Sequence, residues 1–358
     1  MKRILKIEIL VIVLLVAVAI FIRIGDRNQG SEVLQTEPST NQTTLPTTEP
    51  ITQPTTDPAE TVPAISPETT APTAPLTEPT WMAVPEDRVL SCQEYFVYDC
   101  DTGKFLTISS DPDTQVEPAS ITKLFTAYVA MQYLDPEDEI TCYDALHLVV
   151  PGSSTAQLDW AYRLTVAQLV EGMLLPSGND ASYVLAVEVG RIIDGKPNEH
   201  ASVAAESFVA EMNRQAKDLG MTGTNYKNPD GIHRDNHYST LNDLALLGAL
   251  SIKNDTILKY AAITKETVTL ASGQKLEWEN TNALINPESE YYCPYAVGLK
   301  TGQTPYAGSC LLSGFQFEGR NIVVGVFGCE KTDDRFVDTL QLFNEAMGFA
   351  YAPSEDAQ

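Results

Sequence analysis

The residues Glu117-Pro118-Ala119-Ser120-Ile121-Thr122-Lys123 decide how this sequence is interpreted. The apolar spacing that follows them predicts a helix that starts near Ser120, and one helical turn then places Lys123 on the same face as Ser120. A serine hydroxyl is a weak nucleophile until a base takes its proton, and a lysine kept neutral by burial can be that base. The stretch therefore predicts a nucleophile at Ser120 and its base at Lys123.

A second motif, Ser177-Gly178-Asn179, lies between two predicted helices. We expect Ser177 to pass a proton between Lys123 and a leaving group, and Asn179 to position either Lys123 or a substrate amide.

A third motif, Lys300-Thr301-Gly302, ends a predicted strand. Lys300 and Thr301 are expected to hold a substrate carboxylate, and the charge of Lys300 to lower the pKa of Lys123. Glycine at position 302 would let a substrate backbone lie flat against the strand edge.

Each motif alone also has an ordinary structural explanation: a capped surface helix, a helix cap, or a solvated strand end. The chain contains similar patterns elsewhere, at Ser272-Gly273-Gln274-Lys275 in a predicted turn and at Ser39-Thr40-Asn41 in a tract rich in threonine and proline. What distinguishes the three motifs is their context, because they occupy a helix start, an interhelical loop and a strand, as serine acyl-transfer chemistry requires.

The segments around the motifs predict an α+β fold. Strands are expected at Glu94–Asp99 and Lys104–Ser109, and the helix from Ser120 is expected to end before Asp135-Pro136. The later predicted helices are Val166–Leu175, Asn179–Ile193, Ala201–Leu219, Leu241–Ile252 and Asp333–Met347, and the later strands are Thr264–Leu270, Gln274–Glu279, Tyr295–Thr301, Ser309–Phe317 and Ile322–Gly328. Strands at both ends with helices between them predict an antiparallel sheet flanked by helices, with an all-helical insert.

The chain is expected to have three parts. Residues 1–27 join a basic start to an apolar run, which predicts a signal-anchor with its N-terminus inside; a cleaved signal, giving a secreted protein, is the alternative. Residues 28–80 are rich in threonine and proline and contain no lysine or arginine, so a disordered linker is expected. Residues 81–358 would form an extracytoplasmic catalytic domain.

Composition restricts the partners. The formal net charge of −25 argues against nucleic acid and anionic lipid headgroups. No C-x-x-C occurs, so neither a zinc knuckle nor a thioredoxin-like site is supported. His233 and His237 have metal-pair spacing but lack a neighbouring acidic third ligand, so we expect structural roles for them. Neither a metal nor a cofactor is expected.

Two of the six cysteines are predicted to be neighbours. If Gly319-Arg320 forms a two-residue loop between the last two strands, Cys310 and Cys329 lie directly opposite each other and within reach of a disulfide bond.

Together the three motifs resemble the penicillin-binding protein and serine β-lactamase superfamily, and within it the D-alanyl-D-alanine carboxypeptidases of peptidase family S11. The resemblance runs from about Val84 to Phe349. Beyond the motif at Ser120 it includes Leu174-Leu175-Pro176-Ser177-Gly178-Asn179-Asp180-Ala181-Ser182, Asn228-Pro229-Asp230-Gly231, His237-Tyr238-Ser239-Thr240, Gly298-Leu299-Lys300-Thr301-Gly302 and Ala307-Gly308.

The resemblance implies a serine-type carboxypeptidase that acts on peptidoglycan stem peptides ending in D-Ala-D-Ala. Ser120 would attack the penultimate D-alanine carbonyl, the terminal D-alanine would leave, and water would hydrolyse the acyl-enzyme. The backbone amides of Ser120 and Gln303 would form the oxyanion hole. β-Lactams would acylate the same serine, and a monomer is expected. Gln303 stands where relatives often carry an aromatic residue or a histidine, a departure that bears on substrate preference.

Two functions other than a carboxypeptidase make different demands on the sequence. A class A β-lactamase would need a glutamate that activates the deacylating water, and the sequence has no convincing Glu-x-x-x-Asn segment between Asn179 and Lys300. A non-catalytic cell-wall binding module would keep the fold without the chemistry, yet the serines and lysines of all three motifs are retained.

Overall fold

The computed structural model describes residues 88–349. The predicted signal-anchor (1–27), the predicted linker (28–80) and the predicted start of the catalytic domain at residue 81 lie outside the described residues and stay predictions. Within residues 88–349, no helix is long and apolar enough to cross a membrane.

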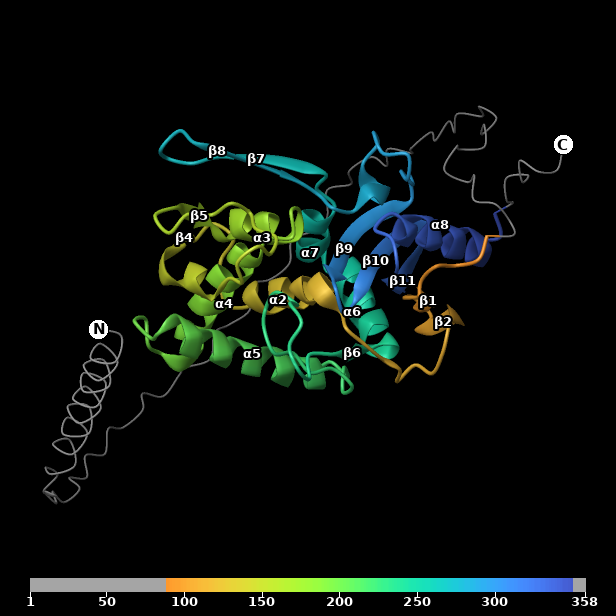
Figure 1. The fold of residues 1–358 in the computed structure, drawn as a ribbon, viewed down its shortest axis with the longest axis horizontal. Coiled ribbons are helices and arrows are strands. Elements are labelled where there is room, and N and C mark those ends of the chain that lie inside the picture. The colour runs from red at the N-terminus through yellow and green to blue at the C-terminus, as the bar shows by residue number, and fades with distance from the viewer. Residues whose placement is uncertain (1–87, 350–358) are drawn as a thin grey trace, which may run out of the picture. The chain divides into compact units, whose positions relative to one another are not determined.

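The centre of the described region is a five-stranded antiparallel sheet with strand order β2-β1-β11-β10-β9. Its strands are β1 (Glu94–Asp99), β2 (Lys104–Ile108), β9 (Ala296–Thr304), β10 (Gly308–Phe317) and β11 (Arg320–Cys329). Because β1 pairs with β11, the sheet joins the first and last parts of the described chain (Figure 1). Strand β9 forms one edge of this sheet.

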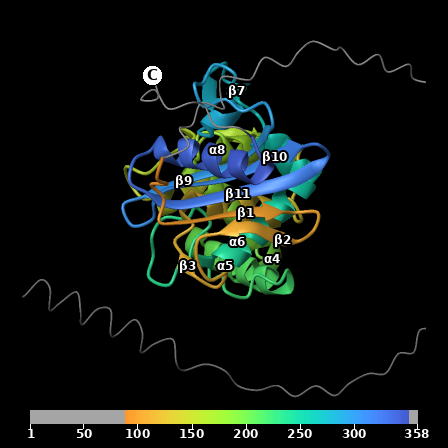
Figure 2. The ribbon, with the colours of Figure 1, turned by 90° about the vertical axis from the view of Figure 1, so that its right-hand side faces the viewer.

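Helices cover both faces of the sheet. Figure 2 shows α8 (Asp334–Met347) on one face and α6 (Leu241–Lys253) on the other. Successive residues of β10 point to opposite faces: Leu311 packs in the cluster that contains Phe343 of α8, and Leu312 packs in the larger cluster on the other side. Burial on both faces explains why these strands are continuous apolar runs without alternation.

The helical insert lies between β2 and β9 in sequence. Its remaining α-helices are α2 (Thr122–Ala130), α3 (Val166–Leu174), α4 (Asn179–Asp194), α5 (Ala201–Asp218) and α7 (Asp255–Ala261). Short helical turns and strand pairs complete it: η2 (Ala119–Ile121), η3 (Tyr143–Leu148) and η4 (Ala283–Ile285), with β3 (Gln115–Val116) paired to β6 (Ser239–Thr240), β4 (Glu139–Thr141) to β5 (Arg163–Thr165), and β7 (Lys265–Thr269) to β8 (Lys275–Glu279). The predicted α+β class, with an antiparallel sheet and a helical insert, is confirmed, although the insert also holds short strands.

The helix that follows Ser120 is shorter than predicted. It ends at Ala130, and the amides of Gln132 and Tyr133 bond carbonyls three residues back, so a tight turn replaces the expected last turn before Asp135-Pro136. The helix start predicted at Val166 is confirmed at α3, where Thr165 and Gln168 form a capping box.

The predicted pairing of Cys310 with Cys329 is wrong for two reasons. The loop between β10 and β11 is Glu318-Gly319, with φ of +50° and +76°, which is the two-residue hairpin turn with positive φ at both central positions. A bulge then shifts the register so that Cys329 lies opposite Ser309. Cys310 and Cys329 consequently pack in different hydrophobic clusters, on opposite faces of the sheet.

The cysteine that lies next to Cys329 is Cys92, two residues before the start of β1. Their sulfur atoms and a carboxylate oxygen of Asp338 all lie within 4.8 Å of one another. The Asp338 carboxylate already accepts hydrogen bonds from the backbone amides of Ser91 and Cys92 and from the Arg88 guanidinium. This carboxylate therefore braces the entering chain, and its lone pairs are occupied by protein donors.

We expect mild oxidation to join Cys92 to Cys329. The two thiols would give two protons and two electrons to a small disulfide such as oxidised glutathione, which is reduced to two thiols. A hydrogen bond with Cys329, burial and the Asp338 carboxylate raise the pKa of the Cys92 thiol, so the reaction should be slow at neutral pH and faster in alkaline buffer.

Peptide mapping without reduction measures which cysteines are joined. Cys310→Ser should leave the Cys92–Cys329 link in place, whereas Cys92→Ser should remove it. A link between Cys310 and Cys329 in the oxidised protein would contradict this arrangement.

Candidate active site

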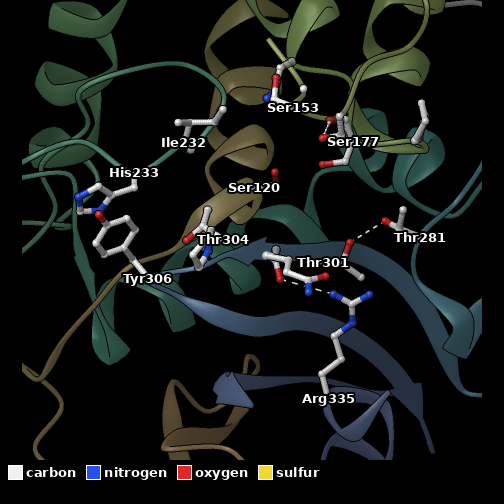
Figure 3. A pocket seen from close by; sticks show the side chains of 18 residues that line it. Ser120, Ser153, Ser177, Ile232, His233, Thr281, Thr301, Thr304, Tyr306 and Arg335 are labelled. Atoms are coloured by element: carbon white, nitrogen blue, oxygen red, sulfur yellow. Dashed lines mark hydrogen bonds between the residues drawn. The ribbon is translucent and has the colours of Figure 1, made fainter. Parts of the chain in front are cut away.

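The structure brings the three sequence motifs together around one cavity of about 610 Å³ (Figure 3). Ser120 comes from η2 just before α2, and Thr301 comes from the edge strand β9. Ser177 lies just before α4, and Asn179 is the first residue of that helix. Segments more than a hundred residues apart in sequence therefore meet at a single site.

Ser120 and Lys123 are in direct contact. Lys123 Nζ lies 2.9 Å from Ser120 Oγ, and the Lys123 side chain has no exposed surface. Burial lowers the pKa of Lys123 from its ordinary value to about 8, whereas the charge of Lys300, predicted to lower it, is not a cause of this shift. A fraction of Lys123 is therefore neutral near pH 7, and neutral Lys123 can accept the Ser120 proton.

The turn Asn228-Pro229-Asp230-Gly231 supplies the second partner of Lys123. Lys123 Nζ donates a hydrogen bond to the Asp230 carbonyl oxygen at 2.7 Å. Gly231 has φ of +82°, and a Cβ there would lie 1.8 Å from the Ala119 carbonyl oxygen. Only glycine permits this close approach, which holds the Asp230 carbonyl against the buried amine.

Asn179 does not share in holding Lys123. It is 2% exposed, and its Oδ1 has no hydrogen-bond partner among the described residues. Buried polar atoms are nearly always paired, so an unpaired oxygen on a residue that lines the cavity is available to a donor on a ligand. Of the two expected roles of Asn179, this arrangement favours contact with a substrate amide.

The loop around Ser177 is rigidly held. Ser177 has φ of +64°, and its carbonyl accepts a hydrogen bond from Ser154 Oγ at 2.9 Å. A Cβ on Gly178 would lie 2.5 Å from the Gly172 carbonyl oxygen, so only glycine fits. Asp180 braces the same loop by accepting from the Ala156 amide at 2.8 Å.

Strand β9 passes close to the nucleophile. A Cβ on Gly302 would lie 3.0 Å from the Pro118 carbonyl oxygen and 3.2 Å from the Ser120 amide nitrogen. The absence of a side chain at Gly302 therefore lets the strand backbone approach Ser120. Gln303 is exposed, and its side-chain amide bonds Thr332 Oγ1 at 3.3 Å.

A buried lysine and a threonine of β9 meet a second threonine, from the segment before η4, at the edge of the cavity. The hydroxyls of Thr301 and Thr281 are 2.6 Å apart, and Lys300 Nζ donates to Thr301 Oγ1 at 3.3 Å. Lys300 is 1% exposed, and burial together with the charges of Lys123 and Arg335 lowers its pKa well below the ordinary value. Because the charged form of Lys300 is disfavoured by burial and by Lys123 and Arg335, an anion bound beside Arg335 and Lys300 would stabilise it, and this region therefore favours an anionic group.

Arg335 is a charged cavity residue that the motifs did not reveal. It lies at the start of α8, is 6% exposed and bonds the Gly302 carbonyl through Nη1 at 3.4 Å, while its Nε has no partner among the described residues. No short pattern surrounds it in sequence, and only the packing of α8 on the sheet brings it to the cavity. None of the described residues that line the cavity is an aspartate or a glutamate.

His233 and His237 have separate partners. His237 Nδ1 accepts from the Lys227 amide, so its Nε2 carries the proton that is donated to Thr122 Oγ1 at 3.1 Å. Burial lowers the pKa of His237 to about 4, which keeps the ring neutral. His233 instead contacts Glu117. The two rings do not converge on a common ligand.

A family model described as D-alanyl-D-alanine carboxypeptidase, peptidase S11, matches residues 81–331. The chain belongs to the peptidase S11 family. A D-alanyl-D-alanine carboxypeptidase of Streptomyces sp. strain K15 is 32% identical over 247 residues, which cover 66% of this chain and 80% of that relative. DacF, a D-alanyl-D-alanine carboxypeptidase of Bacillus subtilis, is 30% identical over 69% of this chain, and the chain spans 59% of its length.

Solved structures share the S11 fold. The crystal structure of the Streptomyces K15 DD-transpeptidase matches with a TM-score of 0.65 and 26% identity, covering 73% of this chain and 99% of that chain. Penicillin-binding protein D2 from Listeria monocytogenes, in its cefotaxime-bound form, matches with a TM-score of 0.59 and 28% identity over 73% of this chain and 99% of that chain. The resemblance inferred from the motifs is thereby confirmed at the level of family and fold.

Proposed function

We propose that this S11 protein is a serine-type D-Ala-D-Ala carboxypeptidase that removes the terminal D-alanine from peptidoglycan stem peptides. One observation carries the proposal: a cavity lined, among the described residues, by Arg335 and by no carboxylate, with Lys300 buried behind it, contains a serine that contacts a lysine with a lowered pKa. In a chain with a net charge of −25, a positive cavity is a specific feature that suits a substrate with a free carboxylate.

The first half of the reaction would follow from these contacts. The substrate carboxylate would bind Arg335, Lys300 and the Thr301 hydroxyl, and the penultimate carbonyl would then lie over Ser120. Neutral Lys123 takes the Ser120 proton as Oγ bonds the carbonyl carbon, and the backbone amides of Ser120 and Gln303 bind the oxyanion.

The second half returns the enzyme to its starting state. The proton on Lys123 passes through Ser177 to the leaving amine, the carbon–nitrogen bond breaks, and D-alanine departs. Water then attacks the ester on Ser120 while Lys123 takes a proton from the water, the bond between the carbonyl carbon and Ser120 Oγ breaks, and Lys123 returns the proton to Oγ as the shortened peptide leaves. β-Lactams, whose carboxylate and reactive carbonyl mimic the substrate, would acylate Ser120 in the same way.

The relatives and the cavity support this function over the two alternatives. The relatives in Streptomyces and Bacillus carry the name D-alanyl-D-alanine carboxypeptidase. A class A β-lactamase mechanism needs a glutamate at the deacylating water, and no glutamate lines the described part of the cavity. A binding module would have no use for a fully buried lysine bonded to the serine. We further propose an extracytoplasmic monomer held at the membrane by its N-terminal segment.

Replacing Arg335, the residue proposed to bind the substrate carboxylate, tests the proposal. Arg335→Ala should lower kcat/KM for release of D-alanine from a soluble peptide ending in D-Ala-D-Ala by about 10- to 100-fold, the value of one hydrogen-bonded charge pair. The same peptide with a C-terminal carboxamide should be a poor substrate for both proteins, because it has no charge for Arg335 to bind.

Arg214→Ala is the matched control, since Arg214 lies on the exposed surface of α5 in ion pairs with Glu211 and Asp218. It should leave kcat/KM unchanged. Equal losses on the carboxylate and the carboxamide peptides in Arg335→Ala would show that Arg335 does not bind the carboxylate. Absence of D-alanine release by the unmodified protein would refute the proposed activity.

A further inference from the structure

Two aromatic side chains form a stack at one end of the cavity, on the opposite side of Ser120 from Arg335 (Figure 3). The rings of Tyr306 and His233 are parallel to within 11°, with centroids 3.7 Å apart. Behind them, His233 Nδ1 lies 2.8 Å from Glu117 Oε1. Tyr306 comes from the turn between β9 and β10, His233 from the loop after Gly231, and Glu117 from the segment that precedes Ser120.

We propose that Tyr306 determines substrate specificity by binding the side chain of the residue that precedes D-Ala-D-Ala. The side chain that fits is a methylene stem ending in an ammonium group, as in a diamino acid. This inference rests on the proposed carboxypeptidase function and names a subsite of the same cavity.

The direction of the substrate follows from β9. With the terminal carboxylate at Arg335 and Thr301 and the scissile carbonyl at Ser120, an extended peptide would continue along the β9 edge past Thr304. Peptides commonly add to a free strand edge in this way, at ~3.3 Å per residue. The residue that precedes the penultimate D-alanine would then lie close enough for its side chain to reach the turn that carries Tyr306.

The chemistry of Tyr306 selects the side chain. Tyr306 is 71% exposed although His233 covers one face of its ring, so the other face is open. An open aromatic face attracts an ammonium group and packs against the methylenes that lead to it. Among the described residues that line the cavity, Arg335 is the only lysine or arginine, and it lies at the other end.

The stack is also held in place before a substrate arrives. Glu117 fixes the orientation of the His233 ring through Nδ1, and that ring supports Tyr306. A side chain held in its binding position loses little freedom when the ligand arrives, which strengthens binding.

Four acetylated peptides ending in D-Ala-D-Ala test the inference, with lysine, Nε-acetyl-lysine, norleucine or alanine as the preceding residue. We expect the unmodified protein to prefer lysine to norleucine, because only lysine carries the charge, and norleucine to alanine, because of its methylenes. Tyr306→Ala should lower the ratio of kcat/KM for lysine over alanine about fivefold, as expected for a cation–π contact. Tyr306→Phe keeps the ring and should retain most of the ratio.

Trp160→Ala removes an aromatic ring that is 65% exposed and lies outside this cavity, so its ratio should match that of the unmodified protein. A lysine-to-alanine ratio that is unchanged in Tyr306→Ala, or equal losses on all four peptides, would overturn the inference while leaving the carboxypeptidase function intact. Failure of the unmodified protein to release D-alanine from any of the four would overturn both.

Discussion

Replacing Ser120 by alanine is expected to abolish both the covalent adduct with a penicillin and the release of D-alanine. The substitution removes the hydroxyl proposed to form the acyl-enzyme, which lies 2.9 Å from the buried Lys123 Nζ. Loss of one hydroxyl from a partly exposed residue should leave the stability close to that of the unmodified protein. The effect is therefore on chemistry and not on folding.

Mass spectrometry after incubation with a fluorescent penicillin locates the adduct. Ser272→Ala is a matched control, because Ser272 begins the second S-x-x-K pattern of the chain but lies exposed in a turn, where its Lys275 is exposed as well. That variant should be labelled like the unmodified protein. Labelling that persists in Ser120→Ala, on Ser177 or any other serine, would show that Ser120 is not the nucleophile.

Replacing Lys123 by methionine should slow acylation by about 10²–10⁴-fold, the usual contribution of a general base. Methionine fills most of the volume of the buried lysine side chain but cannot accept the serine proton. The substitution leaves the Asp230 carbonyl without its donor at 2.7 Å, so a modest loss of stability is expected as well. Thermal unfolding measured alongside the kinetics separates the two effects.

The same residue should set the pH dependence of acylation. Because the neutral amine is the proposed base and burial places its pKa at about 8, the acylation rate constant should rise with pH up to about 8 and level off above it. Below that pH the rate constant should fall about tenfold per pH unit, because the fraction of Lys123 that is neutral falls by the same factor. Stopped-flow acylation measured from about pH 6 to about pH 11, on both sides of the expected midpoint, gives its position.

Lys123→Met should lack this midpoint, and Lys275→Met, which alters an exposed lysine on β8, should retain it. A midpoint near the ordinary lysine value of 10.5 in the unmodified protein would mean that Lys123 is not the group that is titrated.

Much of this protein could be inferred from short-range patterns in the sequence alone. The motif from Glu117 to Lys123 predicted the contact between Ser120 and Lys123, because residues three apart on a helix are neighbours whatever surrounds them. The apolar spacing located α4 and α5 to within one residue at their ends, and the β1 boundaries were predicted without error. The order of the predicted strands and helices was sufficient to predict the α+β fold, and the three motifs with the stretches around them were sufficient to predict the family.

Only the tertiary structure decided the contacts made across the sheet. The bulge beside Ser309 and the Glu318-Gly319 turn determine which cysteine Cys329 meets, and a shift of one residue in register moves a side chain to the opposite face. The positions of Arg335 and Tyr306 at the cavity depend likewise on how α8 and the β9–β10 turn pack around it. Local rules act over a few residues, whereas the burial that lowers the pKa of Lys123, and the carbonyl of Asp230 that holds it, come from segments that meet only when the whole domain has folded.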